Sequence, residues 1–172
     1  ESIRFQAIAY IEKFYEIERI LNINSPFIKP LKKTSARDDS DVEKRTVEIR
    51  QEWSLGLAPI IDVIKLLEEH NIKILEVEAP EGFSGMSLLT DEIAIIVLNK
   101  NINIVRKRLT ALHELAHLIL TFPKEMDEQE TERLCLSFAG AFLLPKEIFI
   151  NELGKNRTTL ILEELISLEN YY

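Results

Sequence analysis

The sequence predicts an α+β fold, in which a small, mostly antiparallel or mixed sheet of about three strands is flanked by several helices. Three short segments with strand character follow one another mid-chain, at residues 72–77, 83–89 and 93–98. Segments with helical spacing of apolar residues precede and follow them. Of the 172 residues, 46% are apolar, which suffices for one core, so we expect one domain over residues 42–172 with a helical arm before it.

Composition and charge exclude several classes of protein. A net charge of −8 argues against direct nucleic-acid binding by this segment. The single cysteine rules out an internal disulfide and favours the reducing cytoplasm. No apolar run approaches the roughly 20 residues of a membrane span, and no signal peptide opens the chain. Because the chain begins with Glu1 rather than Met, we expect a fragment or processed product, with room for a DNA-binding domain upstream.

The segments before the sheet are predicted to be helices joined by loops. Residues 2–21 form an amphipathic helix that covers part of the core or packs on a partner. Residues 22–41 are interrupted by prolines and rich in charge, which indicates an exposed connector. The N-terminal helix and connector therefore occupy residues 1–41. Further helices are expected over residues 42–55 and, opening at Pro59, over residues 59–69.

The three strands differ in character. Residues 72–77 alternate apolar side chains. In residues 83–89, Gly85 marks a bend or a close backbone approach. Residues 93–98 form a strongly apolar strand of the kind that is buried on both faces. Turns are expected at residues 79–82, 90–92 and 99–103.

Four helices are predicted after the sheet. The first runs over residues 104–121 and stops at Pro123, and the second runs from Glu130 to Leu144. Pro145 then opens a short helix over residues 146–152. A last amphipathic helix covers residues 159–168.

The strongest chemical signal is an H-E-x-x-H motif, His113-Glu114-Leu115-Ala116-His117, inside the first of these helices. Residues four apart lie on the same helix face, so His113 and His117 can direct two imidazoles at one point. Glu114 is angled towards the same side. This geometry is typical of a zinc ion held beside a water-activating carboxylate. The alternative is a pair of hydrogen-bonded core histidines, which would leave Glu114 buried at a cost in an apolar helix.

A catalytic zinc site needs a third protein ligand. The pattern with a third histidine after the second is absent, because Pro123 stands at that position. An acidic residue of the following helix is the other solution. Four glutamates lie within reach, namely Glu125, Glu128, Glu130 and Glu132. We favour Glu132, which lies inside the helical pattern, with Glu128 second; Cys135 is better explained as a small buried residue.

The expected chemistry follows from these residue types. Zinc lowers the pKa of its bound water from about 15.7 towards about 7. Glu114 would accept the proton as the water attacks a carbonyl and pass it to the leaving amine. Zinc also stabilises the oxyanion. Candidates for an assisting donor are Arg106, Arg108 and a tyrosine.

Taken together, these residues resemble the ImmA/IrrE family of metallopeptidases over roughly residues 45–150. The segment Arg108-Leu109-Thr110-Ala111-Leu112 and the motif after it are similar to the family's active helix, and Phe138-Ala139 to Leu144-Pro145 are similar to its glutamate helix. Further similarity lies in Trp53-Ser54-Leu55-Gly56, Pro59-Ile60, residues 67–74, Phe83-Ser84-Gly85 and residues 95–99. Cys135-Leu136 replaces the usual Ala-Asn, and Ala116 replaces a common glycine.

The resemblance implies a compact zincin-like fold with zinc held by His113, His117 and Glu132 and with Glu114 as the base. It also implies a helix-turn-helix repressor or regulator as protein substrate or partner, in phage, mobile-element or stress responses. A DNA-binding segment upstream on the same chain is an analogy with family members.

Three hypotheses follow. The chain is a zinc endopeptidase that cleaves a repressor or regulator, or a non-proteolytic metal-binding sensor module of a transcription regulator. In the third, it is a helical interaction or dimerisation domain, a possible homodimer, with structural histidines.

Overall fold

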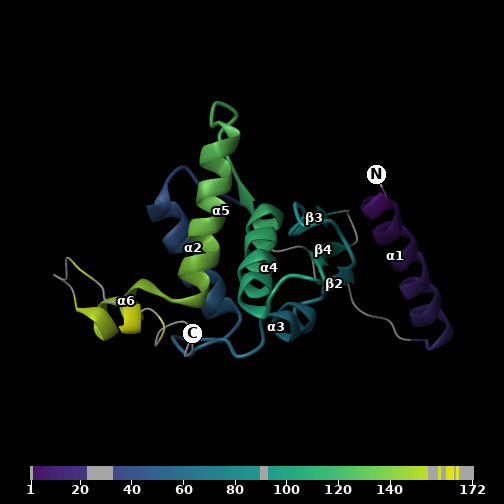
Figure 1. Cartoon of the computed structure of the whole chain (residues 1–172), viewed down its shortest axis with the longest axis horizontal. Helices are drawn as coiled ribbons and strands as arrows, with labels where there is room; N and C mark the ends of the chain where they lie inside the picture. Colours follow the sequence, from purple (N-terminus) through teal and green to yellow (C-terminus); the bar gives the residue numbers. More distant parts are fainter. Residues whose placement is uncertain are drawn as a thin grey trace. The chain divides into compact units, whose positions relative to one another are not determined.

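The computed structural model describes residues 2–22, 33–89, 93–154, 159, 162–164 and 166 (Figure 1). The chain divides into two compact units. The first comprises Glu1–Lys33 and Ile64–Ile119, and the second comprises Thr34–Val63 and Leu120–Tyr172. The fold is α+β, as predicted. The division of the sequence at residue 41 into arm and domain stays a prediction.

The first unit contains a three-stranded mixed sheet in the order β2-β4-β3. β2 (Ile72–Val77) runs parallel to β4 (Ala94–Asn99), and β3 (Gly85–Leu89) runs antiparallel to it. All three predicted strands are confirmed, although β3 begins at Gly85 rather than at Phe83, whose N–H donates to Pro80 O in a turn (2.9 Å). In the described part of the chain, β3 pairs only with β4 and is an edge strand of this sheet.

Two helices cover opposite faces of this sheet. α1 (Ser2–Ile20) packs Ala7 against Val77, Ile95 and Val97 on one face. α4 (Ile104–Ile119) lies on the other face, which carries Leu98, because Gly85 pairs with Leu98 and faces α4 (Figure 1). β4 is therefore buried from both sides, as its uninterrupted apolar sequence predicts. The prediction that the first helix covers part of the core is also confirmed.

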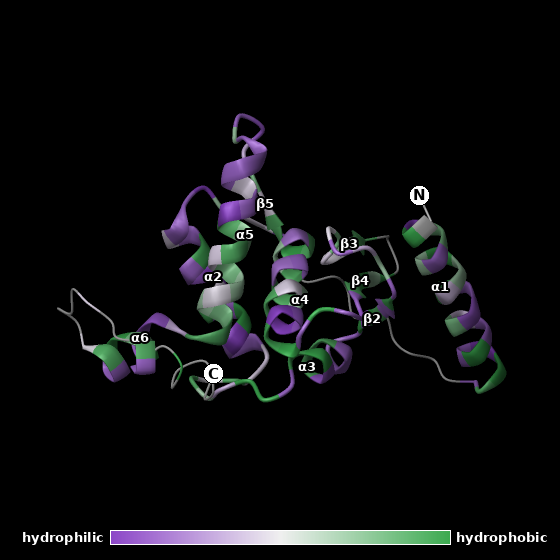
Figure 2. Cartoon of the chain, viewed as in Figure 1, coloured by the Kyte–Doolittle hydropathy of each residue, from purple (hydrophilic) through white to green (hydrophobic). Residues whose placement is uncertain are grey.

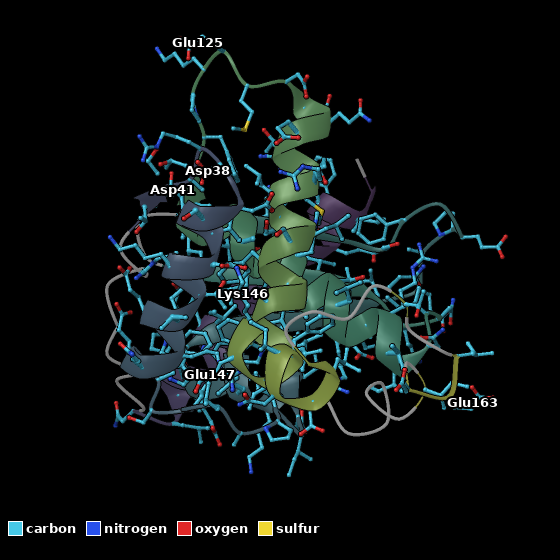
Figure 3. The ribbon with its side chains drawn as sticks, turned by 90° about the vertical axis from the view of Figure 1, so that its left-hand side faces the viewer. Asp38, Asp41, Glu125, Lys146, Glu147 and Glu163 are labelled. Atoms are coloured by element: carbon cyan, nitrogen blue, oxygen red, sulfur yellow. The ribbon has the colours of Figure 1, made fainter. Side chains whose placement is uncertain are left out.

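The second unit is built on two helices, α2 (Asp39–Glu52) and α5 (Glu128–Leu143), followed by α6 (Lys146–Leu153). Aspartates cap both long helices: Asp41 N–H donates to Asp38 (3.0 Å) and Glu130 N–H to Asp127 (2.7 Å). Figure 2 shows that α5 is hydrophilic in its first turns and more hydrophobic in its second half. In Figure 3, Asp38 and Asp41 mark the start of α2, and Lys146 and Glu147 mark the start of α6.

Part of the predicted connector carries regular structure. β1 (Thr34–Ser35) pairs in parallel with β5 (Leu120–Thr121), and α2 begins at Asp39. The prediction of an irregular connector is therefore wrong for these residues, although Ser35 and residues 37–40 are exposed, as expected. Residues 23–32 lie outside the described ranges. The predicted turn at 90–92 and most of the predicted helix at 159–168 also lie outside them.

The helix expected from Pro59 begins later, as α3 (Val63–Glu69). The residues just before the predicted start lie in a loop that Arg50 holds, because its guanidinium donates to Gly56 O (2.9 Å) and Ala58 O (2.6 Å). α4 likewise ends at Ile119, two residues early, because Leu120 and Thr121 form β5.

Within the described ranges, no single helix has the length and apolar composition to cross a membrane. Only α5 and α6 taken together, bent by 64°, pass that test of length and composition.

Candidate metal centre

The first turn of α4 is fixed to the sheet by polar contacts. Asn103 caps the helix by accepting from Arg106 N–H (2.8 Å). Lys107 Nζ binds Glu76 of β2 (2.8 Å), and Arg106 Nη2 donates to Ser84 Oγ (2.7 Å). Further along, the helix buries an apolar face. The buried side chains are Ala111, Leu112, Leu115, Ala116, Leu118 and Ile119. α4 is therefore a rigid support for the motif it carries.

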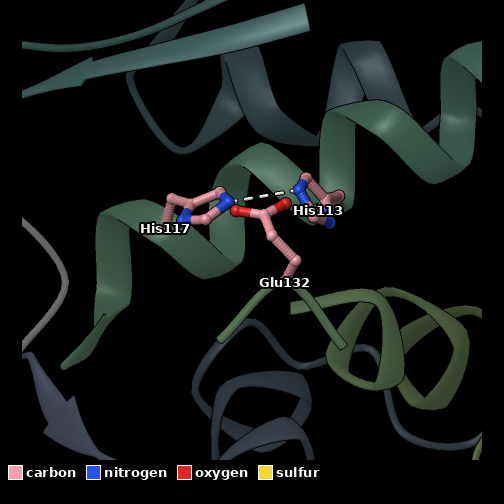
Figure 4. A group of neighbouring side chains, drawn as sticks. All are labelled: His113, His117 and Glu132. Carbon is pink, nitrogen blue, oxygen red and sulfur yellow. Dashed lines mark hydrogen bonds between the residues drawn. The ribbon is translucent and has the colours of Figure 1, made fainter. Parts of the chain in front are cut away.

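His113 and His117 lie next to each other on this support. Their Nε2 atoms are 3.1 Å apart, and their ring planes are inclined by 78° (Figure 4). Both side chains are half-buried. The helical spacing of four residues brings the rings together, as expected.

The distance between these nitrogens fits a shared metal ion. Zinc binds imidazole nitrogen at about 2.0–2.1 Å with tetrahedral geometry, which places two such nitrogens about 3.3 Å apart. The observed 3.1 Å is close to that value. The two imidazoles therefore need little movement to hold one ion.

Glu132 supplies a carboxylate to the same place. One ligand atom each of His113, His117 and Glu132 lie within 4.8 Å of one another, and Figure 4 shows the carboxylate beside both rings. Among the described residues, no other group of three His, Cys, Asp or Glu residues comes together in this way. The structure thus brings Glu132 to the histidines, but not Glu125, Glu128, Glu130 or the buried Cys135.

Glu114 lies on the side of α4 that faces β3. Its side chain is 7% exposed. A Cβ built at Gly85 would be 3.4 Å from Glu114 Cγ and 2.7 Å from Thr110 Cγ2. The close backbone approach expected at Gly85 is confirmed, and it places the motif's carboxylate beside the start of the edge strand.

A polar network holds the turn of α5 that contains Glu132. Arg133 donates to both oxygens of Asp39 (3.1 and 3.0 Å) and to Glu130 (2.9 Å). Ser137 Oγ also donates to Asp39 (2.7 Å). The bonds from Arg133 and Ser137 lower the pKa of Asp39, and the bonds from Glu130 and Asp39 raise the pKa of Arg133. Sequence patterns do not indicate this network, because Arg133 and Asp39 are 94 positions apart and share no local pattern.

A second supporting residue is Asn99 at the end of β4. Its side chain is 1% exposed. Its Nδ2 donates within the loop that leads to β3, to the carbonyl oxygens of Ala79 (3.1 Å), Pro80 (3.3 Å) and Phe83 (2.9 Å). Its Oδ1 accepts from Asn101 N–H (3.0 Å). The sequence indicated only a turn at residues 99–103, and the buried amide explains how that turn fixes the entry to the edge strand.

The residues predicted to assist zinc in stabilising the oxyanion lie in different places. Arg106 is exposed and bound to Ser84, while Arg108 is half-buried. Of the tyrosines that the structure describes, Tyr10 and Tyr15 lie exposed on α1. Whether any of these groups assists the reaction stays a prediction.

Comparison with known families gives one match. The model of a peptidase family, M78, described as the IrrE N-terminal-like domain, matches residues 67–169. The match begins later and extends further than residues 45–150, over which the sequence resembles the ImmA/IrrE family. It covers both α4 and α5. A comparison with curated proteins found no match. The matched region spans more than half of the chain, and the chain therefore belongs to the M78 peptidase family, through its IrrE N-terminal-like domain.

Proposed function

We propose that this protein is a zinc-dependent endopeptidase that cleaves a transcription regulator. His113, His117 and Glu132 are the metal ligands, and Glu114 is the general base. The observation that carries the proposal is the convergence of the two imidazoles and one carboxylate, with ligand atoms within 4.8 Å. Two histidines and one glutamate are also a ligand set of known catalytic zinc sites, in which the fourth position is left for water.

The residues around the metal then have separate tasks. Bound zinc supplies a water whose pKa is lowered from about 15.7 towards about 7, and it polarises the substrate carbonyl. Glu114 takes the proton from the attacking water and hands it to the nitrogen of the leaving amine. Its 7% exposure means that few water molecules compete for that proton.

The edge strand β3 supports a peptide as the substrate. In the described residues, its outer edge has no pairing strand, so its backbone N–H and C=O groups can bind an extended chain. The close packing at Gly85 puts this edge next to Glu114. A peptide paired with β3 would therefore pass beside the base.

The regulator is proposed to be a helix-turn-helix repressor in the cytoplasm. The support is the resemblance of the chain to ImmA/IrrE proteins, together with family membership. The net charge of −8 fits a role in which the substrate, rather than this segment, binds DNA.

The experiment is co-expression with a helix-turn-helix repressor encoded next to the gene. Wild type is compared with Glu114→Gln, which keeps the shape of the side chain and removes the base. Repressor loss with wild type and its survival with Glu114→Gln are expected, and zinc content should be equal in both proteins. Glu128→Gln is the control, since Glu128 lies on α5 outside the metal group.

Other outcomes would support the competing functions. If both proteins bind zinc and change repressor activity equally without cleavage, the chain is a metal-binding sensor module. If neither protein retains zinc, the histidines are structural and the peptidase proposal is wrong.

A further inference from the structure

Arg106 is an exposed cation that is held beside the edge strand. Its Nη2 donates to Ser84 Oγ (2.7 Å), and Ser84 directly precedes β3. Its backbone lies in the capped first turn of α4. Over the residues that the structure describes, no carboxylate forms an ion pair with Arg106, whereas the neighbouring Lys107 is paired with Glu76. Within the described ranges, Arg106 is therefore a cation beside the start of β3 that no carboxylate neutralises.

The position of Arg106 relates it to the bond that would be cleaved. Ser84 is adjacent to Gly85, and Gly85 packs against Glu114. Successive residues of a strand advance by about 3.3 Å. In a peptide paired with β3, the side chain that reaches Arg106 would therefore lie one or two residues from the cleaved peptide bond, for which Glu114 is the base.

The chemistry of the guanidinium indicates what that side chain is. Arginine presents five N–H donors in a planar fork that matches a carboxylate. Ser84 Oγ uses one of these donors. The first turn of a 16-residue helix adds the positive end of its dipole. Both features favour an anion and disfavour a basic residue at this position.

We propose that Arg106 is a specificity-determining residue, which selects substrates with Asp or Glu within two residues of the scissile bond. This inference rests on the proposed peptidase function and adds the substrate class to it. Arg106 contacts the side chain of the substrate rather than the reacting carbonyl. Its loss should therefore change KM more than kcat and leave the zinc content unchanged.

The test is cleavage of a proteome-derived peptide library by the zinc-loaded full chain, read by mass spectrometry, with Glu114→Gln as the blank. Wild type should show Asp and Glu enriched at one position within two residues of the cleaved bond. Arg106→Gln should reduce kcat/KM for a peptide with that acid by about tenfold, which is the usual size for one charge-assisted contact. Arg106→Glu should shift the preference to Lys and Arg. Lys65→Glu, the same charge reversal on exposed α3, is the matched control and should keep the wild-type profile.

The outcomes separate this inference from the proposed function. Glu114-dependent cleavage without acidic preference, or an acidic preference that persists in Arg106→Gln, overturns the role of Arg106 and leaves the peptidase function intact. The absence of any Glu114-dependent cleavage overturns both. A charge-swapped preference in Arg106→Glu supports direct contact, because a merely structural arginine would not reverse it.

Discussion

Gly85 and Glu114 are in close contact across the interface of β3 and α4: a Cβ at residue 85 would lie 3.4 Å from Glu114 Cγ. The edge strand can approach the active helix this closely because residue 85 has no side chain. The contact links the sheet, which would hold a substrate, to the carboxylate proposed to act on it.

Gly85→Ala should therefore impair both stability and activity. The new methyl group would lie 2.7 Å from Thr110 Cγ2 and 3.1 Å from Val97 O, and the latter is backbone that cannot rotate away. Overpacking of this kind costs about 1–3 kcal/mol in the free energy of unfolding, measured by urea denaturation. Gly82→Ala is the control, since a Cβ there meets nothing within 4 Å. Equal stability of the two variants would contradict the close approach.

Asn99 offers a second test, directed at the loop before β3. Asn99→Ala removes the hydrogen bonds to Ala79, Pro80 and Phe83 and should lower the free energy of unfolding by about 1–3 kcal/mol. Asn99→Asp keeps the size of the side chain but replaces the amide donor that faces those carbonyls with an acceptor. It should therefore be no more stable than Asn99→Ala. Asn101→Ala should be near neutral, because Asn101 contributes only its backbone N–H. Thermal unfolding of the three variants and of wild type measures these differences in stability.

The Asp39–Arg133 pair should make stability depend on acid pH. The folded-state pKa of Asp39 is lowered from its ordinary value of 3.8 by the bonds from Arg133 and Ser137. The contribution of the ionised carboxylate is thus fully present above the unfolded pKa and is lost as the pH falls through the lower folded pKa. Unfolding of metal-free protein from pH 6 down to about pH 3 should show wild type converging on Asp39→Asn only below about pH 4. A difference between the two proteins that does not change with pH would exclude this linkage.

Metal binding should stabilise the folded chain. A ligand that binds only the native state at a thousandfold excess over its Kd adds about 4 kcal/mol. Titration of the metal-free protein with zinc should therefore raise the Tm, and a chelator should reverse the increase. His113→Ala should lose this response, Glu132→Ala should need a higher zinc concentration to show it, and Glu128→Ala should keep it. An equal rise in Tm for His113→Ala would place the metal elsewhere.

The sequence predicted those parts that depend on local patterns. Alternation predicts the strand at residues 72–77, and an uninterrupted apolar run predicts the strand at residues 93–98. The helix carrying His113 and His117 follows from apolar residues at helical spacing, and residues four apart lie on one face of a helix. The helical pattern favours Glu132 over three other glutamates, and in the structure a carboxylate oxygen of Glu132 lies within 4.8 Å of ligand atoms of both histidines. The role of Glu132 as a metal ligand stays a prediction.

The rest depends on contacts between distant residues. The predicted helix start at Pro59 is wrong, since α3 begins at Val63, and the loop before it is held by bonds from Arg50 to the carbonyls of Gly56 and Ala58. The network of Asp39, Arg133 and Ser137 joins α2 to α5 across more than 90 positions. Charged residues on helices are ordinarily solvated, so no sequence rule marks these as partners.

The zinc content of purified protein tests the central claim most directly. We predict one zinc per chain in wild type and in Glu114→Gln, a fraction near zero in His113→Ala and His117→Ala, and a Kd weakened by at least tenfold in Glu132→Ala. Retention of stoichiometric zinc by Glu132→Ala with unchanged affinity, or its absence from wild type refolded with zinc, would contradict the account.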